Sequence, residues 1–157
     1  MPEFDPFDGG IDAQVLFLFE KPGPMTSSKG GSGFISRNND DPSAEATFQF
    51  MQAADLPRKL TITWNVIPWW NGTRKVTTQE LREGVRRVED LVTLLPKLRV
   101  VVLVGQKAAR AERYLLGKKL TVFTSAHPSP LVKASNPEMW KSIPSQWSKA
   151  RTALSAG

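Results

Sequence analysis

Four short, largely apolar segments alternate with longer stretches that repeat apolar residues at helical spacing. The apolar segments span residues 13–19, 60–67, 99–105 and 120–126. Their apolar residues run continuously, which is typical of strands covered on both faces of a parallel sheet. Strands that alternate with helices build such sheets. The sequence therefore predicts an α/β fold, a three-layer α/β/α sandwich with a central four-stranded parallel sheet.

The stretches between and after these segments predict helices. Helices are expected over residues 42–55, 77–98 and 106–117, and from about residue 137 onward. Ser43 is of a residue type that caps helix N-termini, and Thr77 with Glu80 has the spacing of a capping box. Gly117 suits a C-cap. The last helix is expected to be interrupted around Pro144, because proline removes a backbone hydrogen bond from a helix.

The composition indicates a folded chain without thiols. At 157 residues, with 40% hydrophobic and 23% charged residues, the chain suits one globular domain over residues 1–157. It contains no cysteine and one histidine. The missing thiols exclude disulfides, cysteine nucleophiles and iron–sulfur clusters, and a single histidine argues against a dedicated transition-metal site. No cofactor is expected.

The N-terminus and the net charge bear on location and partner. No apolar run approaches the roughly 20 residues that cross a bilayer. The segment MPEFDPFDGG is acidic and broken by proline, unlike a signal peptide. We expect a cytoplasmic protein of the bacterial intracellular type that binds no membrane. The net charge of +6 favours an anionic partner, although a solvated lysine surface would give the same balance.

Three loops should meet at one edge of the predicted sheet. Ligands of parallel α/β folds bind beyond the carboxyl ends of the strands. The segments that follow the first, second and fourth strands are residues 20–41, 68–75 and 127–135. The first of these is about twenty residues long, a length that in compact domains is more often functional or mobile than filler.

In these loops the chain resembles the uracil-DNA glycosylase superfamily. The motifs FEKPGP at residues 19–24, NVIPWWNG at 65–72 and HPSPL at 127–131 have the order and approximate spacing of that superfamily, and the likeness covers roughly residues 12–135. The segment VVLVGQKAARA is similar to the branch that usually carries an iron–sulfur cluster. The cysteines that hold that cluster are missing here.

The resemblance assigns roles to four residues. Enzymes of this kind extrude a nucleotide from DNA, read its base and stabilise charge as the glycosidic bond breaks. By the resemblance, Asn65 reads the O4 and N3–H edge of uracil, and the ring of Phe34 stacks on the base. His127 donates a hydrogen bond to uracil O2 as the departing base becomes anionic. Leu131 fills the space that the flipped base leaves.

Each of these residues also has a structural alternative. An asparagine that ends a strand often caps its own turn, which is the alternative for Asn65. Phe34 can instead plug the core and pin the long loop. A lone histidine in a proline-rich turn, such as His127, is usually structural or on the surface, and Leu131 can be a buried turn residue.

Neighbouring residues are expected to contact DNA. Phosphate contacts are expected from Ser129, Lys133 and Arg74. Trp69 and Trp70 either pack under their loop or form a stacking platform for bases beside Arg74.

The first motif departs from the superfamily pattern where water should be activated. Lys21 stands where most members have Asp, Asn or Ala, and a charged lysine cannot take a proton from water. Either Glu20 supplies the carboxylate, or hydrolysis depends mainly on stabilising the anionic leaving group. Asp40 and Asp41 are weaker candidates for activating the water. Lys21 is expected to contact phosphate, although a desolvated lysine could also attack the sugar as a lyase.

Two further departures concern the wall of the base pocket. Gly23 stands where the most uracil-specific branch has a tyrosine that excludes the methyl group of thymine. Exclusion of thymine is therefore weaker, while uracil stays the expected base. Phe19 replaces a residue that is usually glycine, which narrows the pocket wall or moves the water site.

The leading hypothesis is a monofunctional DNA glycosylase that hydrolyses the N-glycosidic bond of uracil in DNA and leaves an abasic site. Its partner would be uracil-containing DNA, single- or double-stranded, bound by a monomer. An alternative function, binding without catalysis, is that of a non-hydrolytic uracil- or damaged-DNA-binding protein of the same fold. Lys21 at the water-activating position motivates it. A third alternative is an unrelated α/β enzyme of free nucleosides, against which the basic loops argue.

Overall fold

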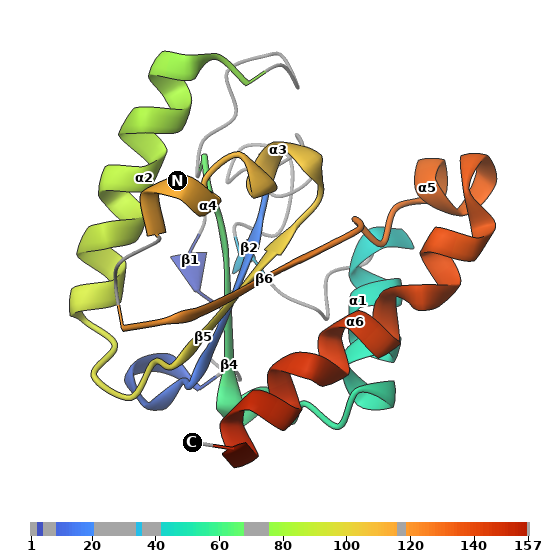
Figure 1. Cartoon of the computed structure of the whole chain (residues 1–157), viewed down its shortest axis with the longest axis horizontal. Helices are drawn as coiled ribbons and strands as arrows, with labels where there is room; N and C mark the ends of the chain where they lie inside the picture. The colour runs from blue at the N-terminus through green and yellow to red at the C-terminus, as the bar shows by residue number, and fades with distance from the viewer. Residues whose placement is uncertain are drawn as a thin grey trace.

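The protein is built on a central sheet of four parallel strands in the order β4-β2-β5-β6 (Figure 1). The computed structural model describes residues 3–4, 9–20, 34–35, 42–67, 76–115 and 119–156. The strands are β2 (Val15–Phe19), β4 (Thr61–Asn65), β5 (Val100–Val104) and β6 (Thr121–Ser125). Each neighbouring pair is parallel, so the predicted sheet is confirmed.

A second, smaller sheet joins the N-terminal segment to the long segment after β2. It pairs β1 (Glu3–Phe4) with β3 (Phe34–Ile35) in parallel, with Glu3 opposite Phe34. The sequence did not predict it. Phe34 was expected inside a glycine-rich loop, and its backbone instead lies in a two-residue strand.

Helices cover both faces of the central sheet, which confirms the three layers (Figure 1). One face packs against α2 (Thr78–Thr93), α3 (Gln106–Ala109) and α4 (Glu112–Leu115). The other packs against α1 (Pro42–Ala53) and α6 (Pro137–Ala156). Side chains of β2 alternate between the two cores, as strand geometry requires: Leu16 and Leu18 belong to the first, and Val15 and Phe17 to the second.

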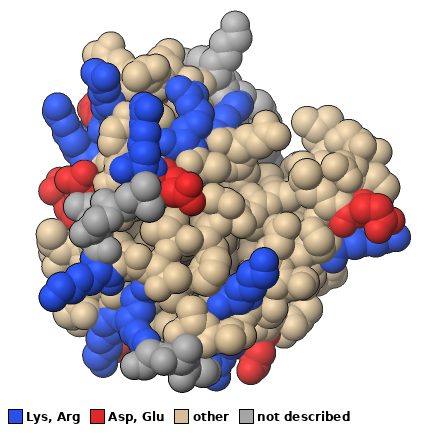
Figure 2. Space-filling model, in the orientation of Figure 1, with Lys and Arg blue, Asp and Glu red and all other residues tan. Residues whose placement is uncertain are grey.

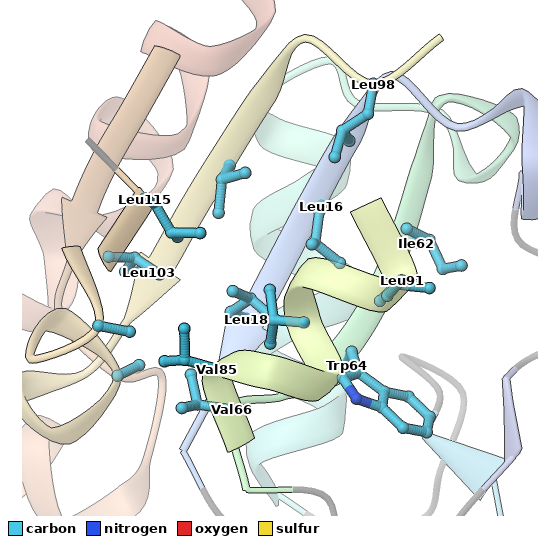
Figure 3. Close-up of a cluster of buried hydrophobic side chains, with 14 of the residues drawn as sticks. Leu16, Leu18, Ile62, Trp64, Val66, Val85, Leu91, Leu98, Leu103 and Leu115 are labelled. Atoms are coloured by element: carbon cyan, nitrogen blue, oxygen red, sulfur yellow. The ribbon is translucent and has the colours of Figure 1, made fainter. Parts of the chain in front are cut away.

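The position of α2 follows from its first turn and from one glycine. Thr77 caps the helix, and Glu80 completes the predicted capping box, with Oγ1 of Thr77 accepting from the Glu80 amide at 3.1 Å. Val85 then meets Leu18 in the core (Figure 3). Gly84 lies so close to the carbonyl of Val66 that a Cβ atom would collide with it. The helix is thereby seated directly against the segment that follows β4.

The expected interruption of the last helix is wrong, because α6 continues through Pro144. A proline inside a helix costs roughly 3 kcal/mol. Ile143 and Trp147 on either side are both fully buried in the core formed with the sheet. Burying side chains of this size stabilises by about 1.5–3 kcal/mol each. Tertiary packing therefore outweighs the local cost.

Two other helix predictions need correction at their ends. The single helix expected over residues 106–117 is divided into α3 and α4, because the amides of Arg110 and Ala111 bond to carbonyls three residues back in tighter turns. The predicted C-cap, Gly117, lies outside the described residues. Helix α1 already begins at Pro42, so Ser43 lies within the helix and does not cap it.

The segment after β6 was expected to be a loop and instead contains the short helix α5 (Pro130–Ser135). Ser129 is its N-cap, and Pro130 occupies the first turn, where a proline has no hydrogen bond to lose. The residues expected to touch DNA in this segment are therefore carried on a helical turn.

Candidate functional site

Three of the predicted site residues lie at the carboxyl edge of the sheet. Glu20 follows β2, Asn65 ends β4 and His127 follows β6. Strand β4, the next strand of the sheet after β2 along the chain, lies on one side of β2, and β5 lies on the other. The carboxyl ends of β2 and β5 therefore border the switch point at which parallel α/β folds bind ligands.

Backbone hydrogen bonds between β2 and β4 fix the position of Asn65 at this edge. It lies opposite Phe19 in the register of β2 and β4, and only 6% of it is exposed. The pairing continues past the strand, because the Val66 amide donates to the Phe19 carbonyl at 2.8 Å and the Ile67 amide donates to the Glu20 carbonyl at 3.1 Å. A buried asparagine with this fixed backbone can present a donor and an acceptor side by side.

Hydrogen bonds of the residues before and after His127 in the sequence fix its position. Before it, Nε1 of Trp147 donates to Oγ of Ser125 at 2.8 Å, and Oε1 of Gln146 accepts from the Ala126 amide at 3.2 Å. After it, the Ser129 amide donates to the carbonyl of His127 itself at 2.8 Å. Helix α6 thus anchors the end of β6, and a tight turn fixes the histidine beyond it.

Phe19 connects the asparagine to the histidine. Residues opposite each other on parallel strands face the same side, so Phe19 and Asn65 share one face of the sheet. The Phe19 ring meets the imidazole of His127 edge to face, with centroids 5.7 Å apart and planes at 82°. Phe19 is therefore the ring contact of His127 and the strand partner of Asn65, two residues 62 positions apart in the chain.

Glu20 is held at the start of α3. Its Oε2 accepts a hydrogen bond from the Lys107 amide at 2.9 Å. Gly105 has a φ of +96°, and a Cβ atom there would stand 2.6 Å from the same oxygen. Glycine at this position therefore both permits the turn and leaves room for the carboxylate.

The residues at α5 that were expected to contact DNA differ in their exposure and in their contacts within the protein. Leu131 is 76% exposed, so it is not a buried turn residue. Oγ of Ser129 accepts from the Val132 amide at 3.3 Å, which engages the hydroxyl as a helix cap. Nζ of Lys133 lies 4.8 Å from the centre of the Trp140 ring, which holds this cation against α6.

Several predicted residues lie outside the described part of the chain. These are Lys21, Gly23, Asp40, Asp41, Trp69, Trp70 and Arg74. Phe34 is described only through its backbone in β3.

Sequence reasoning missed the supporting residues of the site. Gly105 follows a buried strand and precedes a helix, which is a recognisable signal for a backbone that needs positive φ. Trp147 and Gln146 carry no such signal, because their contacts with β6 cross 20 or more positions of the chain.

Neither a metal cluster nor a membrane span is present within the described residues. No group of three or more His, Asp or Glu side chains there could hold a metal ion. No described helix is long and apolar enough to span a membrane.

Comparisons with known proteins bear on the family and the fold of the chain. Residues 6–148 match the family model described as the Uracil DNA glycosylase superfamily. Among solved structures, the chain is similar to the solution NMR structure of a candidate uracil DNA glycosylase from Methanosarcina acetivorans. The two share 16% identity with a TM-score of 0.63, over 94% of this chain and 96% of that one. At this identity the likeness establishes the fold. A search of curated protein sequences found no match.

Proposed function

The chain belongs to the uracil DNA glycosylase superfamily, and from that premise we propose that it is a DNA repair enzyme that hydrolyses the N-glycosidic bond of uracil in DNA. The products are free uracil and an abasic site. The whole chain acts as one domain and as a monomer, on single- or double-stranded DNA.

One observation carries the proposal. The ring of Phe19 contacts the imidazole of His127, and Phe19 lies opposite the buried Asn65 in the sheet. These two contacts of Phe19 support a site at the carboxyl edge to which Asn65 and His127 contribute from different strands. Reading a base and stabilising its charge require such a pair around a single base.

Asn65 selects the base in this proposal. Its amide oxygen accepts from N3–H of uracil, and its amide nitrogen donates to O4. Cytosine presents the reverse pattern at these two positions, so a cytosine would leave buried polar groups unpaired. Such mismatches are costly in a buried site, and Asn65 is 6% exposed.

His127 stabilises the leaving base. The C1′–N1 bond breaks, and its electron pair passes to the base, which becomes an anion with charge on O2. A donor already fixed at O2 stabilises this charge without reorganisation, an effect typically worth about 2.7–4 kcal/mol. The hydrogen bonds that anchor Ser125 and Ala126 to α6 support this fixed placement.

Glu20 activates the water in this proposal. The water oxygen forms a bond to C1′ as the carboxylate takes its proton. Oε2 of Glu20 is engaged by the Lys107 amide, and a carboxylate has further lone pairs to offer.

The remaining predicted residues bind substrate and DNA. Phe34 stacks on the flipped base, Gly23 lines its pocket, and Lys21 contacts phosphate. On α5, the exposed Leu131 enters the space left in the base stack. Ser129, Lys133 and Arg74 contact backbone phosphates.

The test is release of free uracil from a uracil-containing oligonucleotide, with the abasic product revealed by alkaline cleavage. Matched oligonucleotides carrying cytosine or thymine at the same position control for base choice. The proposal expects free uracil and a cleaved strand from the uracil substrate. Absence of both, with a folded protein, contradicts it.

A second candidate function is a uracil- or damaged-DNA-binding protein without hydrolysis. Lys21 favours it, because it stands where a residue that helps activate water is expected, and a charged lysine cannot take a proton from water. Tight retention of uracil-DNA with no free uracil would identify this second function.

A further inference from the structure

A cluster of arginines lies around the only tyrosine of the chain, outside the candidate site. Nη2 of Arg113 donates to the Tyr114 hydroxyl at 2.8 Å, and the same guanidinium stands 4.8 Å from the centre of the tyrosine ring. Arg82 of α2 also acts on the same hydroxyl and lowers its pKa. Two cations from separate helices thus share one acceptor.

A third arginine joins this cluster to the start of α2. Nη1 of Arg110 donates to the Val76 carbonyl at 3.1 Å, just before the helix begins. Arg82, Arg110 and Arg113 are all exposed. Their guanidiniums are therefore held in place by neutral acceptors and remain open to solvent.

The charges of the cluster act on the Tyr114 hydroxyl. The pKa of Tyr114 is lowered, first by the hydrogen bond from Arg113, against the opposing effect of burial, and then by the hydrogen bond from Arg82. Within the described residues, neither of these arginines nor Arg110 forms an ion pair with a carboxylate. Figure 2 shows basic side chains gathered over the region of α2, α3 and α4, with acidic ones at its lower margin.

The location of the cluster relates it to the site. Helix α2 starts at the carboxyl edge of the sheet, after the segment that follows β4, and α3 starts where β5 ends. Both helix starts thus border the edge that carries Asn65 and Glu20 (Figure 1). Arg82 lies in α2, Arg110 at the end of α3 and Arg113 in α4.

We propose that Arg82, Arg110 and Arg113, gathered around Tyr114, form a docking surface for the phosphodiester backbone of DNA flanking the uracil site. The proposal rests on the proposed function for its choice of DNA as the polyanion. Guanidiniums match the geometry of phosphate oxygens, and arginines whose side chains are already ordered lose less entropy on binding. The surface positions the DNA and reads no base.

The test is the salt dependence of binding to labelled DNA that contains no uracil, measured by fluorescence anisotropy between about 50 and 200 mM salt. Removing one protein–phosphate contact on a duplex should lower the slope of log affinity against log salt by about 0.9. We expect this decrease for Arg82→Gln and for Arg113→Gln. Lys59→Gln is the matched control, because Lys59 is an exposed cation just before β4, at the opposite edge of the sheet.

Three outcomes overturn the proposal. One is an unchanged slope in both arginine variants. Another is an equal decrease in the Lys59 control, which would mean that total charge alone matters. The third is that the unmodified protein binds polyglutamate but not DNA, and that the arginine variants lose this binding. That result would make the partner an acidic protein. Circular dichroism confirms that each variant is folded before binding is measured.

The single tyrosine gives an independent readout in the unmodified protein. A phosphate held at Arg82 and Arg113 opposes their effect on the hydroxyl, so DNA should raise the pKa of Tyr114, followed by tyrosinate absorbance. An unchanged titration with DNA bound would contradict the proposal. Because uracil-free DNA is used, failure of base release contradicts only the proposed function, and failure of these measurements contradicts only the docking surface.

Discussion

The ring of Phe19 meets the imidazole of His127 edge to face, with centroids 5.7 Å apart. Phe19 is also the partner of Asn65 in the sheet. This one side chain therefore stands between the residue proposed to read the base and the residue proposed to stabilise it as it leaves.

Replacing Phe19 should impair the chemical step more than substrate binding. An aromatic contact of this kind is worth about 0.5–1.5 kcal/mol, so Phe19→Leu should lower kcat roughly 2- to 10-fold with little change in KM. Phe123→Leu is the control, because Phe123 packs against the same core from β6. Single-turnover kinetics separate the two effects. Equal losses in both variants would mean that Phe19 only supports the core.

Replacing Glu20 by glutamine separates its two roles. The glutamine carbonyl can still accept from the Lys107 amide, so Glu20→Gln should keep its melting temperature. It cannot take a proton from water, and base release should slow by roughly 10²–10⁴. Activity near that of the unmodified enzyme would show instead that hydrolysis depends on stabilising the leaving base.

A methyl group at Gly105 should disturb both the backbone and Glu20. Gly10 and Gly105 both have positive φ, at 55° and 96°, but nothing lies within 4 Å of a Cβ at Gly10. Gly10→Ala should therefore lower the free energy of unfolding only by the cost of a positive φ for alanine, about 1–2 kcal/mol. Gly105→Ala should cost at least about 1 kcal/mol more, because it also displaces the hydrogen-bonded carboxylate. Urea denaturation measures both, and equal costs would contradict the close approach of Glu20.

Replacing Leu131 should affect duplex DNA selectively. Leu131 is 76% exposed, so Leu131→Ala should change the unfolding free energy by less than about 0.5 kcal/mol. Base release from a duplex should fall by about tenfold, or 1.4 kcal/mol, while release from a single strand should hardly change. Leu94→Ala is the matched control, since Leu94 is 65% exposed at the end of α2. An equal loss on both substrates would exclude a wedge.

The sheet and the edge that carries the site were predictable because their signals are local. Continuous apolar runs placed all four central strands, and Thr77 with Glu80 marked the start of α2. Helix α5 was also predictable in principle, since Ser129 and Pro130 are a capping residue and a first-turn proline. The same two residues are equally typical of a turn, because proline is common in both.

The remaining features depend on contacts between distant parts of the chain. Helix α6 passes Pro144 because Ile143 and Trp147 are buried against the sheet. The contact of Phe19 with His127 depends on β5 lying between β2 and β6. The engagement of Glu20 depends on the backbone 87 positions away. No local pattern of residues encodes any of these relationships.

The most direct test of the central claim is single-turnover release of uracil from a uracil-containing duplex by the unmodified protein and by His127→Ala. We expect free uracil from the unmodified protein and a rate roughly 10²–10³ lower for the variant, with DNA affinity retained. Absence of uracil release by the unmodified protein, or equal rates for the two proteins, would contradict it.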